Sequence, residues 1–289
     1  MAESETQRIT YLSKKPIECP VCAAKLNRED LLSGGGRLIA GNLSEELRRD
    51  FEPTARYGEV LPLIYPVTVC PTCCYAAYQQ DFLRLPEERR SEAEAGAQRR
   101  TNGVGMLCGD LDFTEPRRLQ EGLASYFAAM MSYEYFDAEV SPTFKTAVSC
   151  LRAAWLSNDM HKRQANENYS KAAILFYRKA RFFYRQTLNR EQAGDETLDG
   201  AGNFGPDIDK NYGYDGILYL TGLLEFKYGP KKPPETRLAN LEVSKRYVSK
   251  VFGMGKASRA KPSALLEKSK DLYEMMNTEI SELQSENAT

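Results

Sequence analysis

Four cysteines, in two copies of one short motif, are the residues of this chain best suited to chemistry. Cys19 and Cys22 form one C-P-x-C pair, and Cys70 and Cys73 form a second. A C-x-x-C turn directs two sulfurs at one ion, and four thiolates suit the tetrahedral preference of Zn²⁺. The sequence therefore predicts a closed, structural zinc site with the ligands Cys19, Cys22, Cys70 and Cys73.

Other uses of the paired cysteines are weighed against this interpretation. A thioredoxin-like redox site needs one C-x-x-C at the start of a helix in a βαβ unit, and neither pair is followed by that pattern. Iron–sulfur ligation stays open as a further alternative. Cys74 could replace Cys73 as a ligand, but the repeated C-P-x-C pattern favours Cys73 and leaves Cys74 as a core residue. The isolated Cys108 and Cys150 are expected to be small buried side chains.

A catalytic site is not expected elsewhere in the sequence. The chain of 289 residues has one histidine, His161, in a polar segment, and it has neither a P-loop motif nor a G-x-G-x-x-G motif. We therefore expect that the protein is not an enzyme.

Composition places the chain among ordinary globular proteins. Apolar residues make up 42% and charged residues 27%, and the formal net charge is -1. The N-terminus lacks the apolar core of a signal peptide, and no run approaches the ~18 apolar residues of a membrane span. We expect a cytoplasmic protein that does not insert into membranes. Closely spaced cysteines in that compartment favour metal binding over disulfides.

The elements that position the cysteines are predicted to be an α+β arrangement in two parts. A small zinc-ribbon-like module covers residues 11–85; within it, Ser44 to Phe51 is expected to form a short helix and residues 60–70 to be extended. Residues 86–105 are charged and read as a linker or a solvated helix, where we place the domain boundary. Residues 106–289 are expected to be all-helical.

The helical part shows pairs of apolar stripes that resemble tetratricopeptide packing. The helical pattern begins at about residue 116, with a first apolar stripe over 119–127 and a second over 144–155 that starts at Pro142. Further helices are expected at 169–188, 217–227, about 236–252 and 263–283, with small residues such as Gly222 allowing close approach. A strict 34-residue period is absent, and a generic helical bundle is the alternative. The role of the acidic, glycine-rich loop 193–216 between these helices is not indicated by its sequence.

Charge is separated along the helical part. Residues 162–190 contain eight Lys and Arg and one acid, whereas residues 191–225 contain eight acids and one lysine. The spacing of Lys171, Arg178, Arg181 and Arg185 puts them on one side of a helix. They could bind an acidic protein partner or nucleic acid, or they could form ion pairs with the acidic loop that follows. Residues 1–85 have a net charge of -1, which disfavours a nucleic-acid-binding module.

The combination of motifs resembles a bacterial family of uncharacterised proteins with a domain of unknown function. The resemblance rests on the two C-P-x-C pairs, on Tyr75-Ala76-Ala77 and Asp81-Phe82 after the second pair, and on Leu151-Arg152-x-Ala154-Trp155. It covers roughly residues 15–190 and implies a zinc-ribbon-like head with tetratricopeptide-like helices. The sequence departs from the expected pattern at Cys74, where glycine is more usual, and in a long extension over residues 200–289.

These observations together predict a non-catalytic, zinc-stabilised adaptor that binds a protein partner through its helical domain. A nucleic-acid-associated zinc protein, using the basic helix 162–190, is the first alternative. A thiol-redox enzyme is the second.

Overall fold

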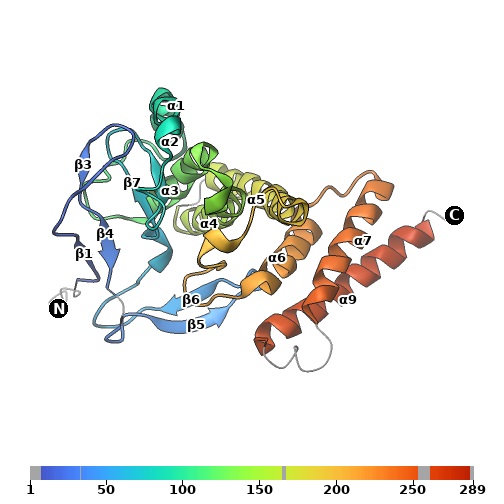
Figure 1. Cartoon of the computed structure of the whole chain (residues 1–289). Coiled ribbons are helices and arrows are strands. Elements are labelled where there is room, and N and C mark those ends of the chain that lie inside the picture. The colour runs from blue at the N-terminus through green and yellow to red at the C-terminus, as the bar shows by residue number, and fades with distance from the viewer. Residues whose placement is uncertain (1–7, 33, 165–166, 253–260, 287–289) are drawn as a thin grey trace.

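The computed structural model describes residues 8–32, 34–164, 167–252 and 261–286. Short strands gather at the N-terminal end of the molecule, and the helices continue from there toward the C-terminus (Figure 1). Every strand in these described ranges lies between Thr10 and Tyr78. The predicted α+β class, with its strands confined to the first part of the chain, is confirmed.

The strands form four two-stranded antiparallel pairs. These pairs are β1 (Thr10–Leu12) with β4 (Glu29–Leu31), β2 (Ile17–Glu18) with β3 (Lys25–Leu26), β5 (Ile39–Leu43) with β6 (Arg49–Glu52), and β7 (Val67–Val69) with β8 (Ala76–Tyr78). Pairs this small have little stability of their own, so they depend on packing or cross-linking. Before β7, residues Pro62–Ile64 form the 3₁₀ turn η1, where extended chain was expected.

The predicted helix from Ser44 to Phe51 is wrong, because this segment is the turn and second strand of the β5–β6 hairpin. The Ser44 N–H donates to the carbonyl of Arg48, and the Ser44 Oγ accepts from the Arg48 N–H. Leu47 has a φ of 61° and is fully buried. The serine that could have capped a helix closes a tight turn, because tertiary packing of Leu47 outweighs local helix propensity.

Residues 86–105 form helices rather than a linker. They comprise η2 (Glu87–Arg89), α1 (Arg90–Ala95) and most of α2 (Ala97–Cys108). Ala93, Arg100 and Val104 are buried, so these helices pack on the rest of the protein. A continuous cluster of buried side chains connects the cysteine region with the helices, and the domain boundary near this point stays a prediction.

The remaining helices agree in position with the predicted apolar stripes. They are α3 (Leu119–Ser132), α4 (Pro142–Arg163), α5 (Glu167–Ala193), α6 (Gly213–Tyr228), α7 (Pro234–Val251) and α9 (Ser263–Glu286), with short 3₁₀ turns η3 (Tyr133–Tyr135), η4 (Ala138–Val140) and η5 (Asp199–Ala201). None of the helices in the described ranges is both long and apolar enough to cross a bilayer.

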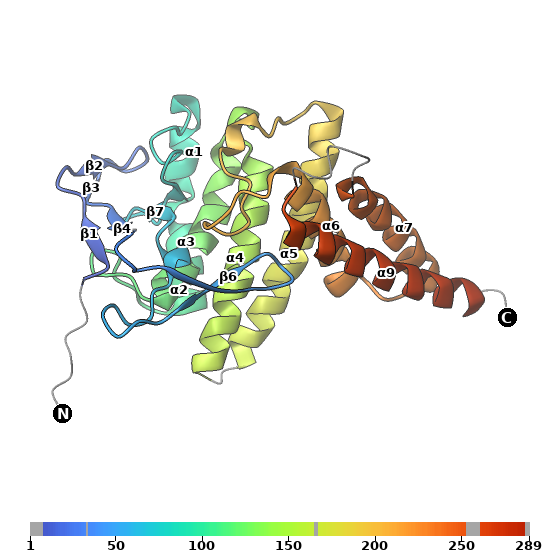
Figure 2. The ribbon, with the colours of Figure 1, turned by 90° about the horizontal axis from the view of Figure 1, so that it is seen from below.

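Successive helices pack in pairs. α4 and α5 lie side by side over most of their length, and α6, α7 and α9 follow as a second group (Figure 2). A Cβ added at Gly222 in α6 would lie 2.3 Å from the Val248 Cγ2 in α7, so the missing side chain permits the close contact that the sequence suggested. α3 packs against β7, β8 and η1 and thereby connects the helices to the strands.

The loop between α5 and α6 returns over the N-terminal end of α4. The Ser141 Oγ donates to the carbonyl of Thr197 at 2.6 Å, and the Thr143 N–H donates to the Glu196 carboxylate at 2.8 Å. Glu196 therefore satisfies a first-turn N–H of α4. One role of this acidic, glycine-rich segment is to complete α4.

Candidate metal centre

Each C-P-x-C motif forms the turn of a β-hairpin. Cys19 follows β2, and the chain returns in β3. Within this turn the Cys19 N–H donates to the carbonyl of Ala24 at 2.9 Å, and the Ala23 N–H donates to the carbonyl of Cys19 at 2.9 Å. The turn thus holds its two cysteines on the same side of a short loop.

The second motif repeats this backbone between β7 and β8. The Cys70 N–H donates to the carbonyl of Tyr75 at 2.8 Å, and the Cys74 N–H donates to the carbonyl of Cys70 at 3.0 Å. The residue after each second cysteine is left-handed, with a φ of 59° at Ala23 and 52° at Cys74. This explains the expectation of glycine at position 74, because a left-handed backbone favours a residue without a Cβ.

The two turns bring all four predicted ligands together. The Sγ atoms of Cys19 and Cys73 lie 3.8 Å apart, those of Cys22 and Cys70 lie 3.5 Å apart, and all four lie within 4.8 Å of one another. Four sulfurs at about 2.3 Å from a tetrahedral zinc ion are separated by about 3.8 Å. Disulfides would need about 2.05 Å between sulfurs, so these cysteines are free thiols arranged as a metal-sized cluster.

In the absence of a cation, contacts within the cluster raise the pKa of the Cys19 thiol, with Cys70 as the largest cause, and that of the Cys73 thiol. Contacts with Cys19 and Cys70 raise the pKa of Cys73, whereas contacts with Cys19 and Cys73 lower that of Cys70. One thiolate is therefore stabilised by neighbouring S–H groups that keep their protons. A divalent ion would remove this competition, because it stabilises thiolates directly.

Arg100 in α2 places a buried positive charge beside the cluster. Its side chain is 1% exposed, and its Nε donates to the carbonyl of Cys73 at 3.2 Å. Both terminal nitrogens are buried without a hydrogen-bond partner, although the guanidinium lies 5.8 Å from the ring centre of Tyr135. A buried guanidinium without an anion is costly. Four thiolates around Zn²⁺ carry a net negative charge, which would offset this cost.

The residues present fit a zinc ion. Cys19, Cys70 and Cys73 are buried and Cys22 is half-buried, so four sulfur donors would enclose an ion and leave little access for water. A complete shell of thiolates suits a structural ion, because a catalytic zinc keeps an open coordination position.

The other three cysteines lie outside this cluster. Cys74 is 7% exposed and packs in the core, as predicted, and Cys150 is completely buried. Cys108 is half-buried. Burial raises the pKa of Cys108 and of Cys150 to about 12, so both thiols stay protonated and weakly nucleophilic near neutral pH.

The basic residues predicted to bind a partner divide into two groups. The Arg181 guanidinium pairs with Glu225 in α6 at 2.7 Å, and Arg185 donates to the Asn240 side chain in α7 at 3.1 Å. These two arginines therefore join α5 to the following helices. Lys171 and Arg178 are on the exposed side of α5.

Sequence reasoning missed Arg100 altogether. It lies in the charged segment E-A-G-A-Q-R-R, where two successive arginines suggest a solvated surface. Nearby Gly96 was a usable signal: a Cβ there would lie 2.2 Å from the Tyr135 Oη and 3.0 Å from an Arg100 terminal nitrogen. A glycine inside a helical segment often marks such close packing.

Comparison with known proteins places the chain among bacterial proteins. Residues 12–276 match the model of a family described as "Uncharacterized protein conserved in bacteria (DUF2225)". An "Uncharacterized protein" of Borreliella burgdorferi (strain B31) is 40% identical over 277 residues, which cover 96% of this chain and 99% of that protein. No solved structure matches. The expectation that residues 200–289 extend beyond the family is wrong as far as residue 276.

Proposed function

The chain belongs to this family of bacterial proteins, and on that premise we propose that it is a non-catalytic, zinc-stabilised adaptor that binds a protein partner. The observation that carries the proposal is the cluster of four thiols within 4.8 Å, next to a buried arginine that lacks an anionic partner. A zinc ion held there by Cys19, Cys22, Cys70 and Cys73 fixes two hairpins that are too small to be stable alone.

The head is zinc-ribbon-like in this proposal. Two hairpins, β2–β3 and β7–β8, each contribute a C-P-x-C turn with the same hydrogen bonds. The ion stabilises the fold and takes no part in a reaction, because four cysteines complete its coordination. We place the protein in the cytoplasm, where thiols are kept reduced and available to zinc.

The helical part is tetratricopeptide-like in this proposal. The extensive α4–α5 pair and the α6–α7 pair support it, as does the close approach at Gly222. Helix pairs of this kind build extended surfaces that bind other proteins. The irregular spacing of the pairs distinguishes the chain from a regular array.

We propose that the partner binds the exposed stripe of α5 formed by Lys171, Leu175, Arg178 and Phe182. Leu175 is 58% exposed and Phe182 is 52% exposed, and both basic residues are also exposed. The spacings of four, three and four residues place all four side chains along one side of the helix. A stripe that alternates basic and apolar groups suits a protein segment with acidic and apolar side chains.

Ion pairing supports a protein partner over nucleic acid. Within 162–190, the basic residues Lys162, Arg163, Arg181 and Arg190 each lie within 4.0 Å of a carboxylate, those of Asp159, Glu59, Glu225 and Glu196. Paired cations attract phosphates weakly, whereas nucleic-acid binding needs an uncompensated basic surface.

Affinity purification from the native bacterium tests the partner surface. Wild-type chain is compared with Arg178→Glu and Phe182→Ser, and the matched controls Lys270→Glu and Met106→Ser change exposed residues of the same type elsewhere. We expect one protein to co-purify with wild type and both controls and to be lost from both α5 variants. Recovery from all five chains, or salt-sensitive binding of RNA or DNA in its place, would overturn this assignment.

Thiol-redox catalysis is separated from zinc binding by chelation. The proposal expects no thiol–disulfide exchange by the zinc-loaded chain, because all four sulfurs bind the ion. Exchange activity that persists both with bound zinc and after its removal would favour the enzyme alternative.

A further inference from the structure

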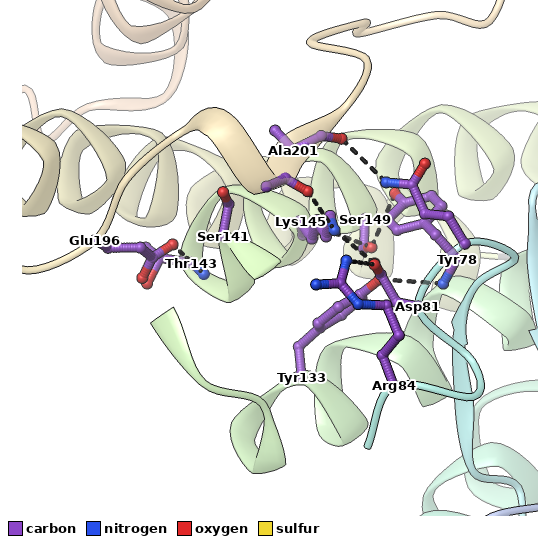
Figure 3. Close-up of polar contacts among 12 residues, drawn as sticks. Tyr78, Asp81, Arg84, Tyr133, Ser141, Thr143, Lys145, Ser149, Glu196 and Ala201 are labelled. Atoms are coloured by element: carbon purple, nitrogen blue, oxygen red, sulfur yellow. Dashed lines mark hydrogen bonds and ion pairs between the residues drawn. The ribbon is translucent and has the colours of Figure 1, made fainter. Parts of the chain in front are cut away.

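A second buried polar cluster lies beyond the C-terminal end of β8, whereas the second cysteine pair precedes this strand. The Lys145 Nζ in α4 is 2.6 Å from the Asp81 Oδ2, and these side chains are 3% and 0% exposed. The Tyr133 Oη donates to the same carboxylate at 2.8 Å, and the Lys145 Nζ also donates to the carbonyl of Gly200 at 2.9 Å (Figure 3). Three separate segments of the chain thus meet at one lysine.

A cavity of about 160 Å³ opens beside this lysine. Lys145 and Arg152 form its charged wall, and their spacing of seven residues places them on the same side of α4. Phe144, Val148 and Ile208 supply apolar wall. Both cationic residues are buried, whereas two side-chain amides, those of Gln80 and Asn203, are exposed at the rim.

The cavity adjoins a wider groove, which gives it a route to solvent. This groove has a volume of about 740 Å³ and shares Pro66, Tyr78, Gln80 and Ile208 with the cavity wall. Here two buried cations line a hollow that connects to the outside.

The charge of the wall selects a ligand with a single negative charge. Lys145 and Arg152 are the charged residues of the wall, and the nearby carboxylates of Asp81 and Asp207 lie outside it. Asp207 accepts backbone N–H groups of Arg49 and Ile208. Lys145 is paired with Asp81, and Arg152 also interacts with Asp207, so the two carboxylates offset most of the charge of the wall. A monoanion suits this nearly balanced wall better than a polyphosphate does.

Size and apolar surface narrow the class of ligand. An apolar cavity of about 150 Å³ is large enough to hold benzene. The apolar side chains would pack on a compact hydrocarbon body, and a guanidinium pairs well with a planar carboxylate. The adjacent Tyr78 ring lies 5.5 Å from the Arg152 Cζ and holds the guanidinium in place.

We propose that this cavity binds a small carboxylic acid with a compact apolar body, with Lys145 and Arg152 recognising the carboxylate. The ligand would be held between α4, β8 and the loop 194–212, so the acidic loop both completes α4 and covers the site. This binding function is separate from the zinc ion and from the exposed stripe of α5.

Isothermal titration calorimetry of the full, zinc-loaded chain tests the proposal. The probes are benzoate and hexanoate, with neutral benzamide and inorganic phosphate as comparisons. We expect one saturable site for at least one of the two carboxylates and affinities at least about tenfold weaker for benzamide and phosphate. If neither carboxylate binds, or if phosphate binds more tightly than both, the proposal is wrong.

A matched pair of asparagine substitutions locates the site without disturbing the fold. Asn203, on the rim, and Asn211, outside the cavity, are both exposed in the same loop, and the Oδ1 of each accepts an N–H two residues later. Aspartate retains that acceptor. We expect Asn203→Asp to weaken carboxylate binding about tenfold through repulsion and Asn211→Asp to leave it nearly unchanged. Equal effects of the two substitutions would overturn the proposed location.

Discussion

The cysteine centre and the Asp81–Lys145 pair are buried polar clusters at the two ends of β8, and they differ in how their charges are balanced. Asp81 and Lys145 neutralise each other at 2.6 Å, with Tyr133 and Gly200 satisfying further bonds. Burial raises the pKa of Tyr133 well above its ordinary value, so its hydroxyl keeps its proton and donates. The Asp81–Lys145 cluster contains both signs of charge among its own side chains.

The cysteine centre lacks such a balance. Its four thiols crowd one another, and Arg100 has two buried nitrogens without a hydrogen-bond partner. A divalent ion would convert the thiols to thiolates and give the guanidinium an anionic neighbour. The comparison teaches that a buried charge without an opposite charge among its neighbours indicates a missing ligand. The Asp81–Lys145 cluster supplies both charges itself, and the Asp81 Oδ1, which accepts no hydrogen bond from the described residues, lies 3.7 Å from the Arg84 guanidinium.

Of the substitutions that distinguish the two clusters, loss of a cysteine ligand should have the largest effect on zinc binding and on the free energy of unfolding. Cys70→Ser should abolish stoichiometric zinc binding and unfold the cysteine module, at a cost above about 5 kcal/mol, because structural zinc contributes about 10–16 kcal/mol in small zinc peptides. Zinc analysis and denaturant unfolding measure this. Cys108→Ser, at a half-buried thiol outside the cluster, should retain zinc; equal zinc loss in both variants would contradict the assigned ligands.

Breaking the Asp81–Lys145 pair should have the next largest effect. Asp81→Ala leaves a buried ammonium without its anion and should lower the free energy of unfolding by about 3–5 kcal/mol, with zinc still bound. Asp81→Asn/Lys145→Met removes both charges and should recover part of that loss. The exposed pair of Arg89 and Glu92 is the control, since Glu92→Gln should change stability by less than about 1 kcal/mol. A double variant no more stable than Asp81→Ala would show that charge balance is not the cause.

Replacing Arg100 should change zinc affinity and metal-free stability in opposite directions. Arg100→Met removes the cation near the thiolates and should weaken zinc binding about 10–100-fold, as outer-shell substitutions do. The same change removes an uncompensated charge from the metal-free state and should stabilise that state. Chelator competition and unfolding with and without metal measure both effects. Weaker stability in both states would mean that Arg100 acts only through packing.

Substitutions at the two left-handed turn residues, Ala23 and Cys74, should have the smallest effects on stability. Ala23 is exposed at φ 59°, so Ala23→Gly relieves backbone strain without loss of packing and should stabilise the zinc-bound chain by about 0.5–1 kcal/mol. Cys74→Gly has the same backbone benefit but loses a buried side chain, and its net effect should be close to zero. Both variants should bind one zinc per chain. Destabilisation by Ala23→Gly would show that the two turns are not equivalent.

The sequence predicts the metal ligands because the relevant information is local. Each C-P-x-C turn is closed by hydrogen bonds within six residues, as between Cys19 and Ala24, so its geometry follows from the motif. The helices were also predictable, since their apolar periodicity is local and strong. The two turns are separated by 47 residues, but their identical C-P-x-C motif was enough to predict that they lie together in the fold.

The features that the sequence did not predict depend on tertiary contacts between distant residues. Glu46, in the segment predicted as a helix, accepts hydrogen bonds from Trp155 and Tyr177, more than 100 residues away. Arg100 and Lys145 resemble surface cations until the fold buries them beside Cys73 and Asp81. Burial and pairing of a charge depend on which elements meet, and neither is encoded in the spacing of neighbouring residues.

Zinc K-edge X-ray absorption on the chain purified without added metal tests the central claim most directly. The assignment of Cys19, Cys22, Cys70 and Cys73 predicts one zinc per chain with four sulfur neighbours at about 2.3 Å and no oxygen or nitrogen neighbour. A folded chain without metal, or a zinc ion with fewer than four sulfur neighbours, would contradict a closed structural centre.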